Sequence, residues 1–244
     1  MLSGPPVSST VSPEQLLERF QASTARQRQS LLRQVLQRRE ELAPLIRERL
    51  DSLDATADDW TGGCLLQILV ETDVQGRESL LARYPEGWLA VASASGIDYS
   101  PLQRHLLLQD YEEADRLTAG ILRQLAGAEA VRRGYVYFSE VAPIAAVDLE
   151  SLDRLWTAYS RGRFGFSVQG RLLAAVDGQW ERLWPRLGWK QDGVWTRYPG
   201  SFTWSLEAPE GHMPLINQLR GVRLMDALLR HPALARRIAA TERT

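Results

Sequence analysis

The sequence predicts an all-α protein, with a bundle of short helices at the N-terminus and a mainly α-helical core that carries long ordered loops. Apolar residues recur at the helical period of 3.6 through much of the chain. The aromatic second half contains too few alternating apolar and polar runs to build a sheet. At 244 residues, with 44% hydrophobic residues, the chain is long enough to bury a substantial core.

The N-terminal third has the pattern of stacked helices. We expect the first helix to begin at Pro13, because proline suits the first turn of a helix. Residues 31–50 repeat the helical period, with a break expected near Pro44. A further apolar segment, residues 64–70, begins at the only cysteine, Cys64, which we expect to pack as a small apolar residue.

Two longer helices are expected in the second half. The first has Asp110 as its N-cap, an apolar face between residues 114 and 125, and Gly127 as its stop. The second follows Asp148 as its cap and runs over residues 149–159.

The helical period is interrupted by proline, glycine and small residues in residues 84–100. On this basis we divide the chain into a disordered leader (1–11), an N-terminal helical bundle (12–92), a core domain (93–232) and a basic tail (233–244). The start has neither a signal-peptide pattern nor a clear transit-peptide pattern. No apolar run approaches the roughly 20 residues of a membrane helix. We therefore expect a cytoplasmic protein.

The sequence contains no pattern typical of an active site. The three histidines, His105, His212 and His231, lie far apart without carboxylate or cysteine partners at metal-ligand spacing. Phosphate-binding glycine loops and the nucleophile elbow of hydrolases do not occur. These observations predict neither a metal site nor catalysis.

The stretch SRGRFGFSVQ, residues 160–169, is similar at first sight to the aromatic strand of an RNA-recognition module. Its residues do not fit the register of that motif, and the net charge of −1 provides no general attraction for phosphate. We expect Gly162 and Gly165 to allow a tight turn, and Phe164 and Phe166 to anchor it in the core. We therefore expect no nucleic-acid binding.

Short loops of the second half combine aromatic, apolar and guanidinium groups, which suit a flat apolar ligand with two carboxylates, such as a porphyrin. Arginines three residues apart are also typical of a solvated helix face, so this pattern alone leaves the ligand open. The apolar candidates are Phe138, Val141, Ile144, Met213 and Ile216, and the arginine candidates are Arg197, Arg220 and Arg223.

A family resemblance narrows the choice. The blocks DYSPLQRHLLLQDYEEADRLT, DLESLDRLWTAYSRGRFGFSVQ, LWPRLGWK and VWTRYPGSFTWSLEAPEGHMPLINQLRGVR occur in this order between about Asp98 and Arg230. Together they resemble the conserved blocks of the genomes-uncoupled-four family. The chain is similar to the cyanobacterial members, which carry an N-terminal helical bundle ahead of the core.

The resemblance implies a non-catalytic regulator that binds protoporphyrin IX and Mg-protoporphyrin IX and stimulates magnesium chelatase in chlorophyll biosynthesis. Its expected partner is the large porphyrin-binding subunit of that enzyme. The resemblance also implies a monomer that associates in part with the photosynthetic membrane.

In the family the ligand lies in a groove between two loop regions, which match residues 135–148 and 208–223. The resemblance assigns Phe138 and Val141 to one side, Arg197 and Tyr198 to the edge, and Arg220 and Arg223 to the other side. The chain has Tyr198 where some relatives have tryptophan, and Met213 where leucine is common. A tyrosine ring and a methionine side chain preserve flat and flexible apolar contacts, so we expect binding with altered selectivity.

Two other classes of function remain as alternatives. The chain could serve as a helical adaptor for protein partners without any small ligand, or it could bind RNA through residues 160–169. Saturable quenching of tryptophan fluorescence by a porphyrin, without a response to RNA, separates the regulator from both alternatives.

Overall fold

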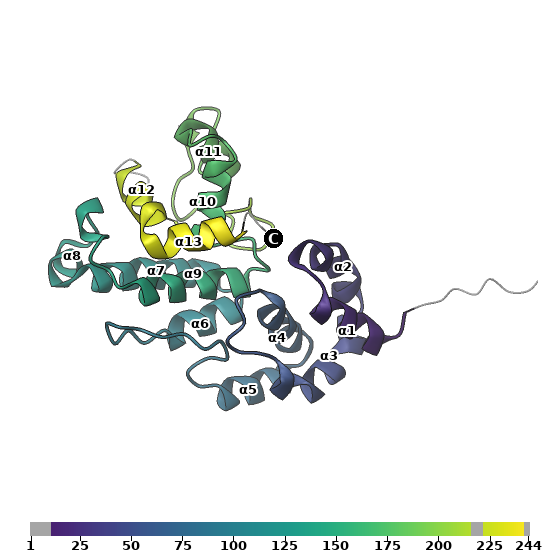
Figure 1. Cartoon of the computed structure of the whole chain (residues 1–244). Helices are drawn as coiled ribbons and strands as arrows, with labels where there is room; N and C mark the ends of the chain where they lie inside the picture. The colour runs from purple at the N-terminus through teal and green to yellow at the C-terminus, as the bar shows by residue number, and fades with distance from the viewer. Residues whose placement is uncertain (1–10, 216–221, 242–244) are drawn as a thin grey trace, which may run out of the picture. The chain divides into compact units, whose positions relative to one another are not determined.

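The computed structural model of the chain describes residues 11–215 and 222–241. Within these residues it confirms the all-α class, with thirteen α-helices, two short 3-10 helices and one two-stranded hairpin (Figure 1). None of these helices is both long enough and apolar enough to cross a membrane. The chain divides into two compact units, residues 1–53 and residues 54–244.

The first unit contains three helices and a 3-10 turn. Helices α1 and α2 each begin at a capping box, in which Ser12 and Thr24 accept a hydrogen bond from the backbone of Gln15 and Gln27. These boxes use backbone donors that a helix start otherwise leaves unpaired. The elements are α1 (Pro13–Ala22), α2 (Ala25–Gln37), α3 (Arg39–Glu48) and η1 (Leu50–Ser52). Their buried core includes Leu16, Leu17, Phe20, Val35, Leu42 and Ile46.

The expected break near Pro44 is wrong, because α3 continues through this residue. The break lies earlier, at Arg38, whose backbone leaves the helical region with φ −106° and ψ 20°. Proline removes the hydrogen bond to the carbonyl four residues earlier, which belongs to Glu40. Glu40 is exposed, so water can hydrate this carbonyl.

The second unit is built around α9, which packs against α4, α6, α10 and α13. Its antiparallel hairpin pairs Lys190 with Trp195 and Gln191 with Val194. The helices before α9 are α4 (Thr61–Thr72), α5 (Val74–Arg83), α6 (Ser100–Leu107), α7 (Tyr111–Ala126), α8 (Ala128–Arg133) and η2 (Phe138–Glu140). From α9 (Ala146–Tyr159) onward the elements are α10 (Phe166–Ala174), α11 (Trp180–Arg186), β1 (Lys190–Gln191), β2 (Val194–Trp195), α12 (Arg223–Arg230) and α13 (Pro232–Thr241).

The C-terminal end of α9 is held by buried hydrogen bonds from two other helices. The carbonyl of Tyr159 accepts one from the hydroxyl of Tyr111 at 2.8 Å and one from the amide of Gln67 at 2.6 Å. The indole of Trp156 donates to the hydroxyl of Thr118 at 3.0 Å. Buried polar groups are costly unless they are paired, so these contacts fix α4 and α7 on α9.

The predicted positions of three core residues are confirmed. Phe164, Phe166 and Cys64 are completely buried. In the turn that carries the two phenylalanines, Gly162 and Gly165 have positive φ values of 73° and 134°. A side chain is strained in this region of backbone conformation, and glycine is not.

The compact units divide between residues 53 and 54 rather than near residue 92, where the sequence suggests a boundary. The reason is that the segment around residue 92 is bound to α9. The hydroxyl of Ser151 accepts a hydrogen bond from the backbone of Ala92 and donates one to its carbonyl. The carboxylate of Asp148 accepts from the hydroxyls of Ser93 and Tyr99. Irregular local sequence therefore does not mark a break in packing here.

The two expected helix caps have different roles from those predicted. Asp110 lies at the N-cap of α7, but its carboxylate binds Nδ1 of His105 at 2.9 Å instead of a helix backbone donor. Asp148 lies inside the first turn of α9, whose N-cap is Ala145. Its partners come from the segment that precedes α6, so it stabilises tertiary packing.

The expected basic tail at residues 233–244 is wrong for most of its length, because α13 extends to Thr241 and packs on α9 and α10. Arg237 on this helix binds the buried carboxylate of Asp153 at 2.5 Å and the carboxylate of Asp58 at 2.6 Å. A charge buried like that of Asp153 requires a partner, which the last helix supplies.

We expect Phe164→Ala to lower the free energy of unfolding by about 3–5 kcal/mol, because it removes a buried ring and leaves a cavity. The matched control is Phe138→Ala, since Phe138 is 47% exposed and its loss should cost far less. Urea unfolding followed by circular dichroism measures both variants. Equal losses would contradict the assignment of Phe164 to the core.

Candidate ligand-binding site

An exposed aromatic segment follows α8. Tyr137 and Phe138 are 46% and 47% exposed, which is unusual for rings of this size. The segment is held from behind by Arg133, which donates to the carbonyl of Tyr135 at 3.0 Å and to the carboxylate of Glu140 at 2.6 Å. Glu140 also accepts a hydrogen bond from the backbone of Tyr137. The ion pair between Arg133 and Glu140 fixes the loop, and the rings of Tyr137 and Phe138 remain partly exposed to solvent.

Two predicted apolar residues of this loop lie beneath its surface. Val141 is 1% exposed and Ile144 is 4% exposed, so both pack inside the protein. They support the loop, and within this conformation they offer little surface to a ligand. Phe138 is the candidate of this loop whose ring is open to solvent.

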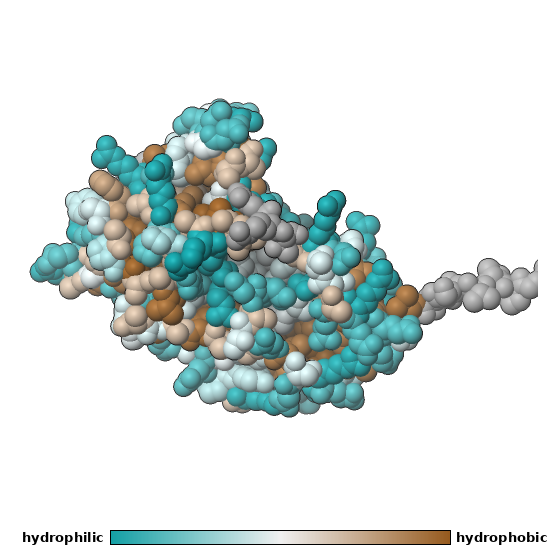
Figure 2. Space-filling view, in the orientation of Figure 1, coloured by the Kyte–Doolittle hydropathy of each residue, from teal (hydrophilic) through white to brown (hydrophobic). Residues whose placement is uncertain are grey.

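An arginine from a distant segment lies beside this ring. The guanidinium carbon of Arg223, at the start of α12, is 5.5 Å from the centroid of the Phe138 ring. The two elements, α12 and η2, pack against each other. Figure 2 shows apolar side chains gathered on the face of the second unit that carries α10, α11 and α12. An apolar ring and a cation therefore meet at one place.

The second loop region, which begins at residue 208, is held by hydrogen bonds to the segment SRGRFGFSVQ, residues 160–169. The backbone of Gly211 donates to the carbonyl of Arg163 at 2.8 Å, and the backbone of Gly165 donates to the carbonyl of Met213 at 3.0 Å. The amide of Gln169 donates to the carbonyls of Gly211 and Pro214 at 3.0 and 2.8 Å. We call these contacts between residues 163–169 and 208–214 the loop clamp.

The predicted residues of this second loop fall into two groups. Met213 is completely buried within the loop clamp and has no open surface. Ile216 and Arg220 lie outside the residues that the structure describes.

The imidazole of His212 supports the same loop. Its Nδ1 is 2.6 Å from the carbonyl of Leu187, and its Nε2 accepts a hydrogen bond from the backbone of Thr203. Burial lowers the pKa of His212, which favours the neutral ring with its proton on Nδ1. Both ring nitrogens are thus used inside the protein.

The two candidates at the groove edge follow the hairpin. Arg197 and Tyr198 are both exposed, and the ring of Tyr198 makes edge contacts with Phe202 and Trp204 at 5.6 and 5.8 Å. The hydroxyl of Tyr198 donates to the carboxylate of Asp115 at 3.2 Å. This contact connects the edge loop to α7.

Asp115 contacts two of the loops considered above and was not among the predicted site residues. Its side chain is 2% exposed, and its carboxylate also accepts a hydrogen bond from the backbone of Leu215 at 2.6 Å. Burial raises the pKa of this carboxyl to about 7, although the hydrogen bonds from Leu215 and Tyr198 oppose the rise. A signal was present in the sequence, because Asp115 occupies the apolar face of α7 that Thr118 and Leu122 continue.

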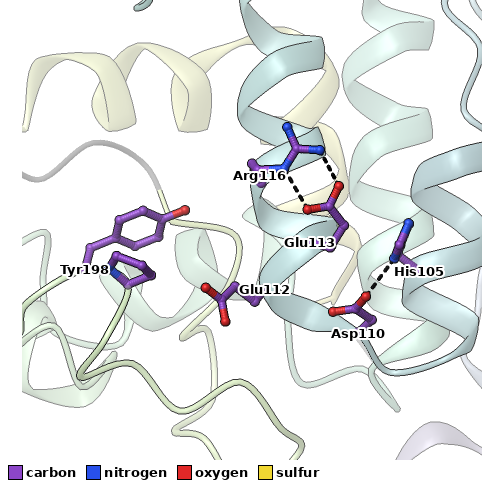
Figure 3. A pocket seen from close by; sticks show the side chains of 7 residues that line it. His105, Asp110, Glu112, Glu113, Arg116 and Tyr198 are labelled. Carbon is purple, nitrogen blue, oxygen red and sulfur yellow. Dashed lines mark hydrogen bonds and ion pairs between the residues drawn. The ribbon is translucent and has the colours of Figure 1, made fainter.

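A pocket of about 680 Å³ lies between Tyr198 and the start of α7 (Figure 3). Figure 3 shows the hydroxyl of Tyr198 pointing toward α7, where Glu113 is paired with Arg116 and Asp110 with His105. Its lining consists of His105, Asp110, Glu112, Glu113, Arg116, Tyr198 and Pro199. Three of these residues are carboxylates, which repel an anionic ligand, so a dicarboxylate fits the side of Phe138 and Arg223 better.

A family model described as GUN4-like matches residues 92–232. The chain belongs to this family. The matched region begins where the sequence suggests the start of the core, and it contains every predicted site residue.

Relatives of the family share substantial sequence with the chain. It is 51% identical over 153 residues to the Ycf53-like protein of Synechocystis, an alignment that covers 63% of this chain and 66% of the relative. It is 35% identical over 198 residues to a ycf53 protein of Pyropia yezoensis, covering 79% and 81%. The chloroplastic tetrapyrrole-binding protein of Arabidopsis thaliana is 39% identical over 146 residues, covering 56% and 55%.

Solved GUN4 structures have a similar fold. The structure from Chlamydomonas reinhardtii is 39% identical, with a TM-score of 0.56, and the similarity covers 59% of this chain and 95% of that one. The ligand-free structure from Arabidopsis thaliana is 40% identical, with a TM-score of 0.53, covering 57% and 99%.

We expect Gln169→Ala to weaken the loop clamp, because it leaves the carbonyls of Gly211 and Pro214 without their buried donor. The expected loss in free energy of unfolding is about 1–3 kcal/mol. Hydrogen exchange of residues 208–215 should accelerate, as measured by mass spectrometry. The control is Gln191→Ala, at an exposed position of the hairpin. If both variants exchange alike, Gln169 does not hold the loop.

Proposed function

We propose that this protein binds protoporphyrin IX and Mg-protoporphyrin IX in a groove between residues 135–148 and 208–223. The observation that carries the proposal is the position of the Arg223 guanidinium beside the exposed ring of Phe138. The name of the Arabidopsis relative, a tetrapyrrole-binding protein, supports the same class of ligand.

The chemistry of the two residues suits the two parts of such a ligand. A porphyrin presents a flat apolar face, which gains free energy when an aromatic ring removes it from water, at roughly 25 cal/mol per Å². Its propionates carry negative charge at the edge, where a guanidinium can form paired charge-assisted hydrogen bonds. Phe138 supplies the face contact, and Arg223 supplies the charge.

Contacts with the face and the edge dominate over ligation of a central metal in this proposal. Among the described residues, His105 lies in the acidic pocket, and both nitrogens of His212 have partners within the protein. His231 is buried, and its Nδ1 accepts a hydrogen bond from the backbone of Ala233. Cys64 is completely buried in α4. A magnesium porphyrin bound here would therefore depend on contacts with its face and edge, as would metal-free protoporphyrin.

The proposed biological role is that of a regulator without catalytic activity of its own. The groove takes up porphyrin and, while the protein is bound to the large porphyrin-binding subunit of magnesium chelatase, alters how that subunit accepts or releases it. Family membership supports this role. We further propose that the protein is a cytoplasmic monomer and that a fraction of its molecules associates with the photosynthetic membrane.

We expect Arg223→Ala to raise the Kd for deuteroporphyrin about tenfold or more, because a hydrogen bond to a charged group contributes about 1.5–3 kcal/mol. The measurement is quenching of tryptophan fluorescence together with the shift of the Soret band.

The matched control is Arg230→Ala, on the same helix α12, where the side chain is 80% exposed and pairs with Asp226. Its Kd should stay within about twofold of the wild type, because exposed ion pairs contribute little. Absence of saturable quenching by the wild-type protein would favour the adaptor alternative. A response to single-stranded RNA instead of porphyrin would favour the third alternative.

We expect the wild-type protein to increase the rate of magnesium insertion by purified chelatase at porphyrin concentrations below saturation. Arg223→Ala should lose most of this stimulation, and Arg230→Ala should retain it, since Arg223 lies beside Phe138 whereas Arg230 pairs with Asp226. A protein that binds porphyrin but leaves the chelatase rate unchanged would contradict the regulatory role and leave the ligand assignment intact.

A further inference from the structure

Asp115 joins three segments that are distant in the sequence. Its carboxylate on α7 binds the hydroxyl of Tyr198, 83 residues away, and the backbone of Leu215, 100 residues away. Tyr198 belongs to the edge loop, and Leu215 directly follows the loop clamp. One buried carboxylate therefore joins the edge loop to the end of the second loop region of the proposed groove.

The charged groups near Asp115 come from α7, and its uncharged hydrogen-bond partners come from the two loops. On α7, Glu112 lies one turn earlier and raises its pKa, and Arg116 lies beside Tyr198 and acts on that hydroxyl. The edge loop contributes Tyr198, and the described part of the second loop contributes only the backbone N–H of Leu215. Burial is the largest influence and brings the pKa of Asp115 to about 7, within the physiological range.

We propose that Asp115 is a positioning residue that takes up a proton when the groove binds its porphyrin, so that affinity increases as the pH falls from 8 to 6. This inference rests on the proposed function. The proton comes from solvent, and it neutralises the carboxylate without breaking either loop contact.

Hydrogen-bond chemistry allows the protonated form to keep the same partners. The carbonyl oxygen of a protonated carboxyl still accepts from the N–H of Leu215. Its hydroxyl can donate to the oxygen of Tyr198, whose own proton then turns away. The loops stay in place while the buried negative charge disappears.

A bound porphyrin favours this protonated form through two effects, both of which raise the pKa of Asp115. Tyr198 is 45% exposed in the free protein, and a ligand against its ring removes water near Asp115, which penalises the charged carboxylate. The negative charge of the propionates, although paired with Arg223, also acts in the same direction as the charge of Glu112, which already raises the pKa of Asp115. By linkage, a ligand that prefers the protonated protein binds more tightly at low pH.

The test is a porphyrin titration of wild type and Asp115→Asn at pH 6, 7 and 8, with Mg-deuteroporphyrin as the probe. Carboxyl groups like the propionates stay ionised over this range. The wild-type Kd should rise about three- to tenfold from pH 6 to pH 8. Asp115→Asn should show a flat profile, because an asparagine amide can accept from Leu215 and donate to Tyr198 but does not titrate.

Two further variants separate a titrating role from a merely structural one. Glu112→Gln removes an exposed charge that raises the pKa of Asp115, so its affinity should begin to fall at a lower pH than in the wild type. Tyr198→Phe removes a hydrogen bond that lowers the pKa of Asp115, so its affinity should begin to fall at a higher pH than in the wild type.

Calorimetry keeps the inference testable if Asp115→Asn does not fold. Wild-type titrations at pH 7.5 in two buffers of different ionisation enthalpy count the protons taken up on binding, and we expect between about a third and three quarters of a proton. No proton uptake, or equal pH profiles in the wild type and Asp115→Asn, would overturn the inference while the porphyrin site stands. Absence of wild-type binding at every pH would instead overturn the proposed function.

Discussion

The loop clamp between residues 163–169 and 208–214 is the constraint on which the groove depends. Residues 196–215, the described part of the chain between the hairpin and α12, form no regular element, so their backbone polar groups need partners from elsewhere. The turn before α10 and the amide of Gln169 supply them. Gly165 is essential to this arrangement, because a Cβ there would lie 2.9 Å from the carboxylate of Asp153.

A rigid helical scaffold with ordered loops explains how the two sides of the groove come together. Phe138 comes before α9 in the sequence, and Arg223 comes after α10. They meet because the short elements that begin with them, η2 and α12, pack against each other. Loops positioned by a firm core commonly carry binding residues. Two side chains that are buried or half-buried also fix these loops: Arg133 pairs with Glu140 in the first loop, and Asp115 accepts a hydrogen bond from Leu215 in the second.

Local pattern predicts much of this protein, and its limits are physical. Helical spacing indicated α7 and α9, and the failed RNA register correctly assigned Phe164 and Phe166 to the core. Asp115 was missed because its partners are far along the chain, and Val141 looked like a groove wall because sequence does not say which side of a loop faces water. The irregular stretch near residue 92 similarly hides the hydrogen bonds that tie it to α9.

The last helix has a consequence for the order in which the protein matures. Asp153 accepts a hydrogen bond from the backbone of Ser167, at the start of α10, and its other oxygen binds Arg237 on α13. Arg237 lies 84 residues after Asp153, so this ion pair joins segments that are far apart along the chain. Contacts of such high sequence separation form slowly, because the intervening chain must first be ordered. Docking of α13 on the carboxylate of Asp153 is therefore coupled to the turn that carries one side of the loop clamp.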